Sequence, residues 1–157
     1  MIIVETNNMN KFFEQSQEWS PLTKEQLTKL KRKAYDNARL GNGGGKLVTS
    51  LRKQGLSEEE IGIRVGRKEF DLTDEMIQEQ WCKQRGRCDD LKILIDANEL
   101  FITRSMFAPS IDRIDNELGY IEGNIRITLV WTNVGRSEMN IDVWKEKIKE
   151  IKLTLAA

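Results

Sequence analysis

Four polar side chains in the last third of the chain could act together on a metal ion or a phosphate. Asp112 and Arg113 lie side by side in a stretch that alternates between apolar and polar residues. Asn124 closes a loop with two glycines, and Asn133 lies in a stretch with helical spacing. Carboxylate and amide oxygens suit a hard cation such as Mg²⁺, which often keeps several waters and one or two protein ligands. A guanidinium suits a phosphate, because it can donate two parallel hydrogen bonds to the phosphate oxygens.

The spacing around these residues predicts the elements that position them. Alternation over residues 110–114 predicts a strand, and residues 116–123 predict a loop. Alternation resumes over residues 125–129, and helical spacing then takes over. A ββα unit of this kind would bring the four polar side chains together.

The whole stretch over residues 109–136 reads P-S-I-D-R-I-D-N-E-L-G-Y-I-E-G-N-I-R-I-T-L-V-W-T-N-V-G-R. It resembles the HNH (His-Me finger, ββα-metal) endonucleases, in particular a phage and bacterial branch with the pattern S-x-D-R-I-D…G-Y…G-N…N. The resemblance extends from Phe70 onward. It implies that Asp112 and Asn133 hold one divalent metal, Mg²⁺ or Mn²⁺, and that Asn124 braces the turn. It also implies DNA as the partner and leaves a phage-encoded origin open.

Arg113 stands where this family usually has a histidine that acts as the general base, and the chain contains no histidine. Arginine stays protonated at neutral pH, so it cannot abstract a proton. We expect Arg113 to hold a phosphate oxygen instead, and the base to come from Asp115, from Glu122 or from a metal-bound water. A competing role for Asp112 is an ion pair with Arg113 or Arg126.

Three functions remain open on these observations. The first is a metal-dependent DNA endonuclease in which Arg113, Asp115 and Asn124 serve catalysis. The second is a catalytically inactive DNA-binding or structural module that retains the HNH fold. The third is a regulatory protein that binds a partner through its N-terminal helices alone.

Composition limits the class of protein. The 157 residues carry 25 basic and 25 acidic side chains, with 39% hydrophobic residues, which is typical of a globular protein. The sequence shows no apolar run long enough to span a bilayer and no signal-peptide pattern at its start, so we expect a cytoplasmic protein with no membrane contact. Cys82 and Cys88 without histidine cannot fill a zinc shell, so no structural zinc is expected and Cys88 is interpreted as a buried apolar residue. A homodimer remains open.

Positive charge is concentrated between residues 26 and 56, where eight basic residues face a single acid, Asp36. Segregated charge can form a basic face that attracts phosphates, although such a run also fits an ordinary solvated helix. We expect DNA contacts from this run and from one arginine of the predicted finger: Lys29, Lys31, Arg32, Lys33, Arg39, Lys46, Arg52, Lys53 and Arg136.

The fold class predicted from these patterns is α+β, with a helical, basic region over residues 1–69 and an HNH-like ββα-metal domain over residues 70–157. Capping boxes at Thr23 and Ser57 and a cap at Thr73 predict three helix starts. A helix over residues 46–54 lies between the first two. The pair around Gly55 also fits a helix-turn-helix, but a packing pair fits better, because the next helix begins with acidic residues. Of the four tryptophans, Trp131 and Trp144 are predicted to lie in the core.

Overall fold

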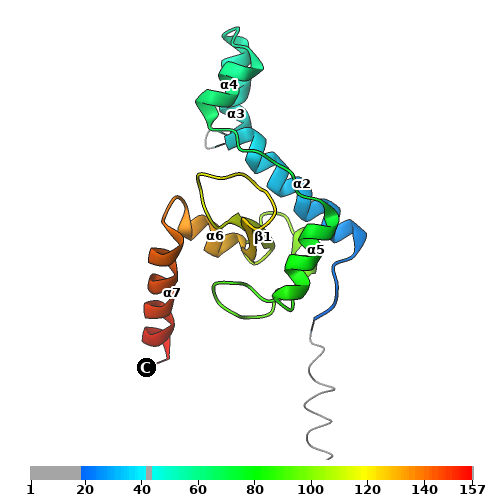
Figure 1. Ribbon diagram of the computed structural model, residues 1–157, viewed down its shortest axis with the longest axis vertical. Coiled ribbons are helices and arrows are strands. Elements are labelled where there is room, and N and C mark those ends of the chain that lie inside the picture. The colour runs from blue at the N-terminus through cyan, green and yellow to red at the C-terminus, as the bar shows by residue number, and fades with distance from the viewer. Residues whose placement is uncertain (1–18, 42–43, 157) are drawn as a thin grey trace, which may run out of the picture.

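The structure is a computed structural model that describes residues 19–41 and 44–156, and it has an α+β architecture. Within these residues, six α-helices and one 3₁₀ helix surround a two-stranded antiparallel sheet (Figure 1). No helix among the described residues is long and apolar enough to cross a membrane. In chain order the elements are α2 (Lys24–Leu40), α3 (Gly44–Lys53), α4 (Glu58–Val65), α5 (Asp74–Lys83), η2 (Ala97–Phe101), β1 (Pro109–Arg113), β2 (Ile125–Leu129), α6 (Val130–Arg136) and α7 (Ile141–Leu155).

Helix α2 is the longest helix and begins at the predicted capping box. The Thr23 hydroxyl accepts from the Gln26 amide, and the Gln26 side chain accepts from the Thr23 amide. Leu30, Ala34 and Ala38 recur at the spacing of one helix face and are buried. Gly41 ends the helix at φ 56°, where a Cβ atom would lie 1.7 Å from the Val65 carbonyl oxygen, so only glycine fits.

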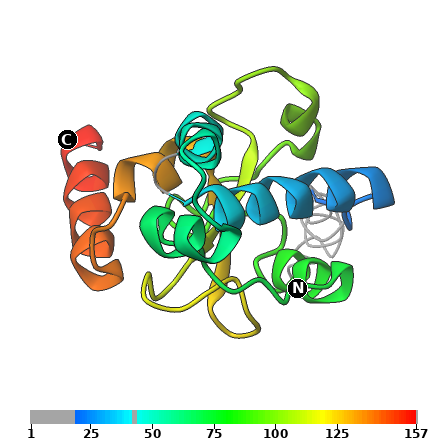
Figure 2. The same cartoon turned by 90° about the horizontal axis from the view of Figure 1, so that it is seen from above.

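Strands β1 and β2 form the predicted hairpin, and α6 follows β2 directly. The register pairs Ile111 with Ile127 and Asp112 with Arg126. Successive side chains of a strand point to opposite faces, so the isoleucines and the charged pair occupy different faces. The isoleucine face joins the hydrophobic core, and the charged face lies toward α6. Figure 2 shows α2 running across the body of the molecule, with α7 on the side away from the N-terminal end of α2.

Two apolar clusters hold the structure. The larger one joins α2, α5 and the hairpin, so the two regions predicted from sequence share a core. The smaller one joins α3 and α4 through Val48, Leu51, Ile61 and Val65, with Leu40 at the end of α2 packed against it. These two helices project beyond the sheet (Figure 1). We therefore expect the α3–α4 hairpin to open more easily than the rest of the chain, because fewer buried apolar contacts hold it.

Two details differ from the sequence predictions. Trp144 is buried as expected, but Trp131 is 44% exposed, because its position on α6 faces away from the hairpin. The sequence also predicts that Asp142 caps the second part of the last helix, but helix α7 is capped by Asn140, since the Asn140 side chain accepts from the amides of Asp142 and Val143. The buried position of Cys88 was predicted correctly.

Candidate functional site

Asp112 lies at the centre of a buried ion-pair network. Its Oδ2 accepts from Arg126 Nε and Nη2 at 3.0 and 2.7 Å. Arg136 Nη1 donates to Oδ1 and Oδ2 at 3.0 and 2.9 Å. The side chains of Arg126 and Arg136 are only 2% and 1% exposed. The pairing with Arg126 that sequence left open for Asp112 is therefore present, and a second arginine completes it.

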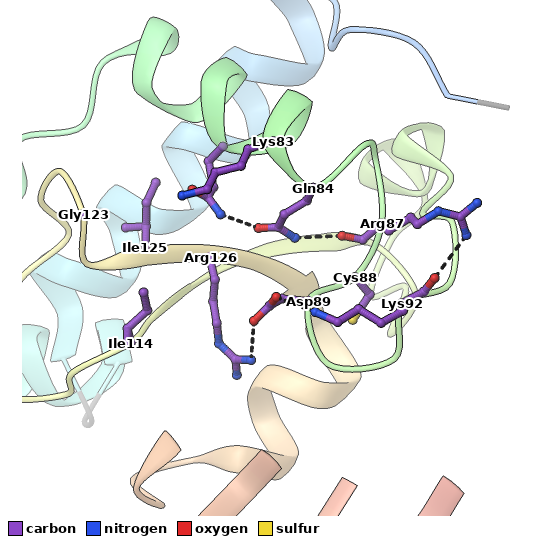
Figure 3. Close-up of a pocket in the computed structure, with 11 residues that line it drawn as sticks. Lys83, Gln84, Arg87, Cys88, Asp89, Lys92, Ile114, Gly123, Ile125 and Arg126 are labelled. Carbon is purple, nitrogen blue, oxygen red and sulfur yellow. Dashed lines mark hydrogen bonds and ion pairs between the residues drawn. The ribbon is translucent and has the colours of Figure 1, made fainter. Parts of the chain in front are cut away.

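The network extends from Arg126 to a pair of consecutive acids. Arg126 Nη1 contacts Asp90 and lies 3.3 Å from Asp89 Oδ2, as the dashed line in Figure 3 shows. Burial alone would lower the pKa of Arg126, but Asp112 and Asp90 outweigh it, so the pKa is raised and the guanidinium stays charged. Burial raises the pKa of Asp89, but Lys92 and Arg126 lower it by more, so the pKa of this carboxyl lies below its usual value. Arg126 and Asp89 are thus kept ionised by their neighbours.

Arg136 connects α6 to the end of β1. Its guanidinium donates to the main-chain carbonyls of Arg113, Ile114 and Met139, in addition to the Asp112 carboxylate. The sequence prediction placed Arg136 among the DNA contacts. The structure instead buries the side chain and directs its N–H groups into the protein, where a phosphate cannot reach them.

The geometry around Asp112 does not fit the predicted metal site. Both carboxylate oxygens already accept from guanidinium groups, whose positive charge opposes a bound cation. The Asn133 amide donates to Ser110 Oγ at 2.8 Å and to the Ile111 carbonyl at 3.4 Å. No group of three His, Cys, Asp or Glu side chains suited to a metal occurs in the described part of the chain. Binding of Mg²⁺ or Mn²⁺ through Asp112 and Asn133 stays a prediction, and it requires both arginines to release the carboxylate.

Asn124 holds the loop between the strands. Its Oδ1 accepts from the Asp115 amide at 2.8 Å, and its Nδ2 donates to the Asp115 and Gly119 carbonyls at 3.0 and 2.9 Å. These are the bonds of a turn brace. The Asp115 carboxylate in turn accepts from the Glu117 amide at 2.9 Å, whereas Glu122 is exposed on the same loop.

Arg113 is held by its own loop, away from the ion-pair network. Its Nη1 donates to the Asn116 and Leu118 carbonyls at 2.7 and 3.0 Å, and its guanidinium lies 5.4 Å from the Tyr120 ring centre. Burial raises the pKa of Tyr120, so the phenol stays neutral. Arg113 lines a hollow of about 350 Å³ together with Lys68 and Asn133. The predicted Arg113 and Asn133 are thus brought to one hollow, and Asp112 is not among its lining residues.

The basic run on α2 and α3 is partly neutralised. Ion pairs join Arg32 to Asp36 at 3.0 Å and Arg52 to Glu58 at 2.6 Å, and Lys31 pairs with Asp74. Lys29 lies over the Phe101 ring, and Arg39 donates to the Tyr35 hydroxyl. The remaining cations of the predicted set form no ion pair with any described residue: Lys33, Lys46 and Lys53.

Gln84 holds the turn after α5. Its Nε2 donates to the Arg87 carbonyl at 2.7 Å (Figure 3). The same Nε2 donates to the Ile127 carbonyl at 2.7 Å, and Oε1 accepts from the Ile127 amide at 2.8 Å. The wholly buried Cys88 follows in the same turn, with Sγ 3.9 Å from Thr132 Oγ1. A side-chain amide therefore ties the turn to β2.

Sequence reasoning missed two residues that lie beside Asn133. Arg104 and Ser110 line a second hollow with Lys33 and Asn133. Arg104 lies in an irregular loop, so no periodicity marked it, and its φ of 59° is visible only in the structure. In comparisons with family models, curated proteins and solved structures, no match to this chain was found.

Proposed function

We propose that this chain is a DNA-binding module that keeps an HNH-like ββα fold without a working hydrolytic centre. The observation that carries the proposal is the Asp112 carboxylate, which is buried and bonded on both oxygens by Arg126 and Arg136. Breaking a buried ion pair from one side costs about 3–5 kcal/mol, so the carboxylate is not readily available to another cation.

The other candidates for hydrolysis also have structural roles. Arg113 stays protonated and cannot act as a base. The Asp115 carboxylate accepts from the Glu117 amide, and Asn124 braces the loop through three hydrogen bonds. These bonds shape the ββα unit, and of the candidate bases only Glu122 lies exposed on the loop without such a bond among the described residues.

Binding to DNA is supported by cations that have no acidic partner among the described residues. Lys33 on α2 and Arg104 before β1 line one hollow, and Lys68 and Arg113 line its neighbour. Cations that neutralise phosphates release counterions, and this makes binding favourable and sensitive to salt. The chain's net charge of zero does not oppose this, because locally concentrated cations can attract phosphates even when the total charge is zero.

Fluorescence anisotropy with a labelled duplex, measured at several salt concentrations, tests this proposal. We expect binding that weakens as salt rises, with the same affinity for unrelated sequences. A parallel assay with supercoiled plasmid and Mg²⁺ or Mn²⁺ should show no cleavage that depends on Asp112. Absence of binding at 50 mM salt, a low concentration at which roughly micromolar non-specific affinity would be visible, would reject the proposal.

A metal-dependent endonuclease is the second candidate, and one observation favours it. Asn133 bonds to the Ile111 carbonyl, directly beside Asp112, so β1 and α6 bring the two predicted ligands close in the fold. Plasmid cleavage lost in both Asp112→Asn and Asn133→Ala, but kept in Glu117→Gln, would establish this function instead. Glu117→Gln is the control because this carboxylate lies on the exposed loop.

A further inference from the structure

A hollow of about 470 Å³ lies between α2, the loop before β1 and the start of α6. Its polar lining comes from Lys33, Asp36, Asn37, Arg104, Ser110 and Asn133, and its wall is completed by apolar side chains such as Val130 and Val134. Three separate parts of the chain therefore direct polar groups toward one space.

The hollow offers mainly hydrogen-bond donors. Lys33 and Arg104 form no ion pair with a described residue. The Ser110 Oγ accepts from Asn133 Nδ2, so the hydroxyl proton is left to donate elsewhere. Asp36 is the acid of this hollow, and its carboxylate accepts from Arg32 Nε at 3.0 and 3.2 Å, which offsets its charge.

Two features show that the cations are placed at a cost. Arg104 has φ 59°, a left-handed conformation that is uncommon for a non-glycine residue and that is enriched at functional sites, although Arg85, Lys92 and Ser137 also adopt it outside this hollow. The pKa of Lys33 is lowered by burial and by the neighbouring Lys29. A bound anion would relieve the repulsion between these lysines, so both features favour a negatively charged ligand.

We propose that this hollow binds one phosphate of the DNA backbone, with Lys33 and Arg104 supplying the charge and Ser110 a further donor. The inference rests on the proposed function and names this hollow as one place where the chain contacts DNA. The neighbouring hollow, with Lys68 and Arg113, shares Asn37, Asn133 and Val134 with this one. A DNA backbone bound in this hollow would therefore continue from the pair Lys33 and Arg104 to the pair Lys68 and Arg113.

The test compares Lys33→Gln/Arg104→Gln with a matched control, Arg64→Gln/Lys145→Gln. Each double variant removes one lysine and one arginine charge, and the control residues lie on α4 and α7, outside both hollows. Anisotropy with a labelled duplex gives affinity and salt slope, and a thermal melt confirms folding of each variant. The wild-type Asn133 side-chain amide is also followed by NMR during titration with inorganic phosphate, which distinguishes free phosphate from the backbone.

We expect Lys33→Gln/Arg104→Gln to weaken duplex binding about tenfold or more and to flatten the salt slope by about 0.9 for each lost phosphate contact. The control should change affinity less than about twofold, as is typical of distant solvated charges. If both double variants lose the same duplex affinity, or neither loses any, the hollow is not a phosphate site, although the chain still binds DNA.

A wild type that does not bind the duplex rejects the proposed function itself. A shift of the Asn133 amide with inorganic phosphate would then reassign the hollow to free phosphate, and no shift would reject it as an anion site.

Discussion

The chain places two pairs of cations near β1 and treats them in opposite ways. Arg126 and Arg136 are buried, and each is bonded to Asp112. Lys33 and Arg104 line an open hollow a short distance along the same strand and have no acidic partner among the described residues. Arg126 and Arg136 stabilise the fold, whereas Lys33 and Arg104 are available to a ligand.

This difference explains how a ββα unit can change its chemistry without changing its outline. A carboxylate in this position has the same sequence pattern whether it holds a metal or a guanidinium. The choice depends on the groups opposite it, and here these are the arginines of β2 and α6. Both oxygens of the Asp112 carboxylate are therefore bonded by guanidinium groups of the chain itself.

Asp112→Ala removes the carboxylate that pairs with both buried arginines, and it has the largest expected effect. Removing the carboxylate leaves two buried guanidinium groups facing each other, so the free energy of unfolding should fall by about 3–5 kcal/mol. Urea denaturation measures it, with Glu117→Ala on the exposed loop as the control. A loss below about 1 kcal/mol would show that the arginines do not depend on Asp112, as a carboxylate reserved for a metal would allow.

Gln84→Leu compares the neutral hydrogen bonds between Gln84 and Ile127 with the ion pairs of Asp112. The substitution removes the partner of the Ile127 amide and one of the two donors to the Ile127 carbonyl, which keeps the Asp89 amide at 2.9 Å. It should cost about 1–3 kcal/mol, the usual penalty for an unsatisfied buried polar group. Denaturation midpoints of Gln84→Leu and of Gln54→Leu, an exposed glutamine on the turn after α3, give the comparison. If the two variants unfold alike, Gln84 does not hold β2.

Lys33→Ala and Arg32→Ala sharpen the second half of the comparison, because the residues are adjacent on α2. Arg32 is already paired with Asp36, so its loss removes no free cation but uncovers the Asp36 carboxylate of the hollow, and it should weaken duplex binding less than the loss of Lys33 does. Lys33 has no such pair, and its loss should weaken binding by roughly 3–10-fold. Anisotropy at fixed salt measures both. An equal loss would mean that ion pairing on α2 does not decide which cations meet DNA.

Glu58 gives the smallest effect, at an exposed ion pair. Hydrogen bonds from Arg52 and then from Arg67 lower the pKa of Glu58 to about 2. A lowered pKa stabilises the folded chain above the ordinary pKa of about 4.3, and this contribution is lost as pH falls toward 2. The denaturation midpoints of wild type and Glu58→Gln should therefore converge between pH 4.5 and 2. Glu59→Gln is the control and should follow wild type throughout.

Local patterns in the sequence predicted the elements well. The capping boxes at Thr23 and Ser57 form as expected, and alternation around Asp112 correctly gives β1. Such signals are local, since a cap or a strand is decided within a few residues. The α+β class was predicted for the same reason.

The site was harder to predict because its contacts are distant in sequence. Asp90 meets Arg126 across 36 residues, and Gln84 meets Ile127 across 43. The helical spacing that puts Asn133 and Arg136 on one face of α6 was visible, but not the carboxylate that Arg136 reaches. Trp131 was predicted to lie in the core because it lacks the basic and aromatic neighbours of a single-strand binder, but the structure leaves it 44% exposed.

The side chains that tie the hairpin together also seal its margins. The Gln84 amide occupies both main-chain groups of Ile127 on the outer side of β2, and Asn133 and Arg136 occupy the Ile111 and Arg113 carbonyls on the outer side of β1. A two-stranded sheet with open margins would invite a third strand from another molecule. Here an incoming strand would find both Ile127 main-chain groups and the Ile111 and Arg113 carbonyls already bonded, which disfavours strand addition at these positions. Any molecule that docks on this unit has to be recognised through side chains.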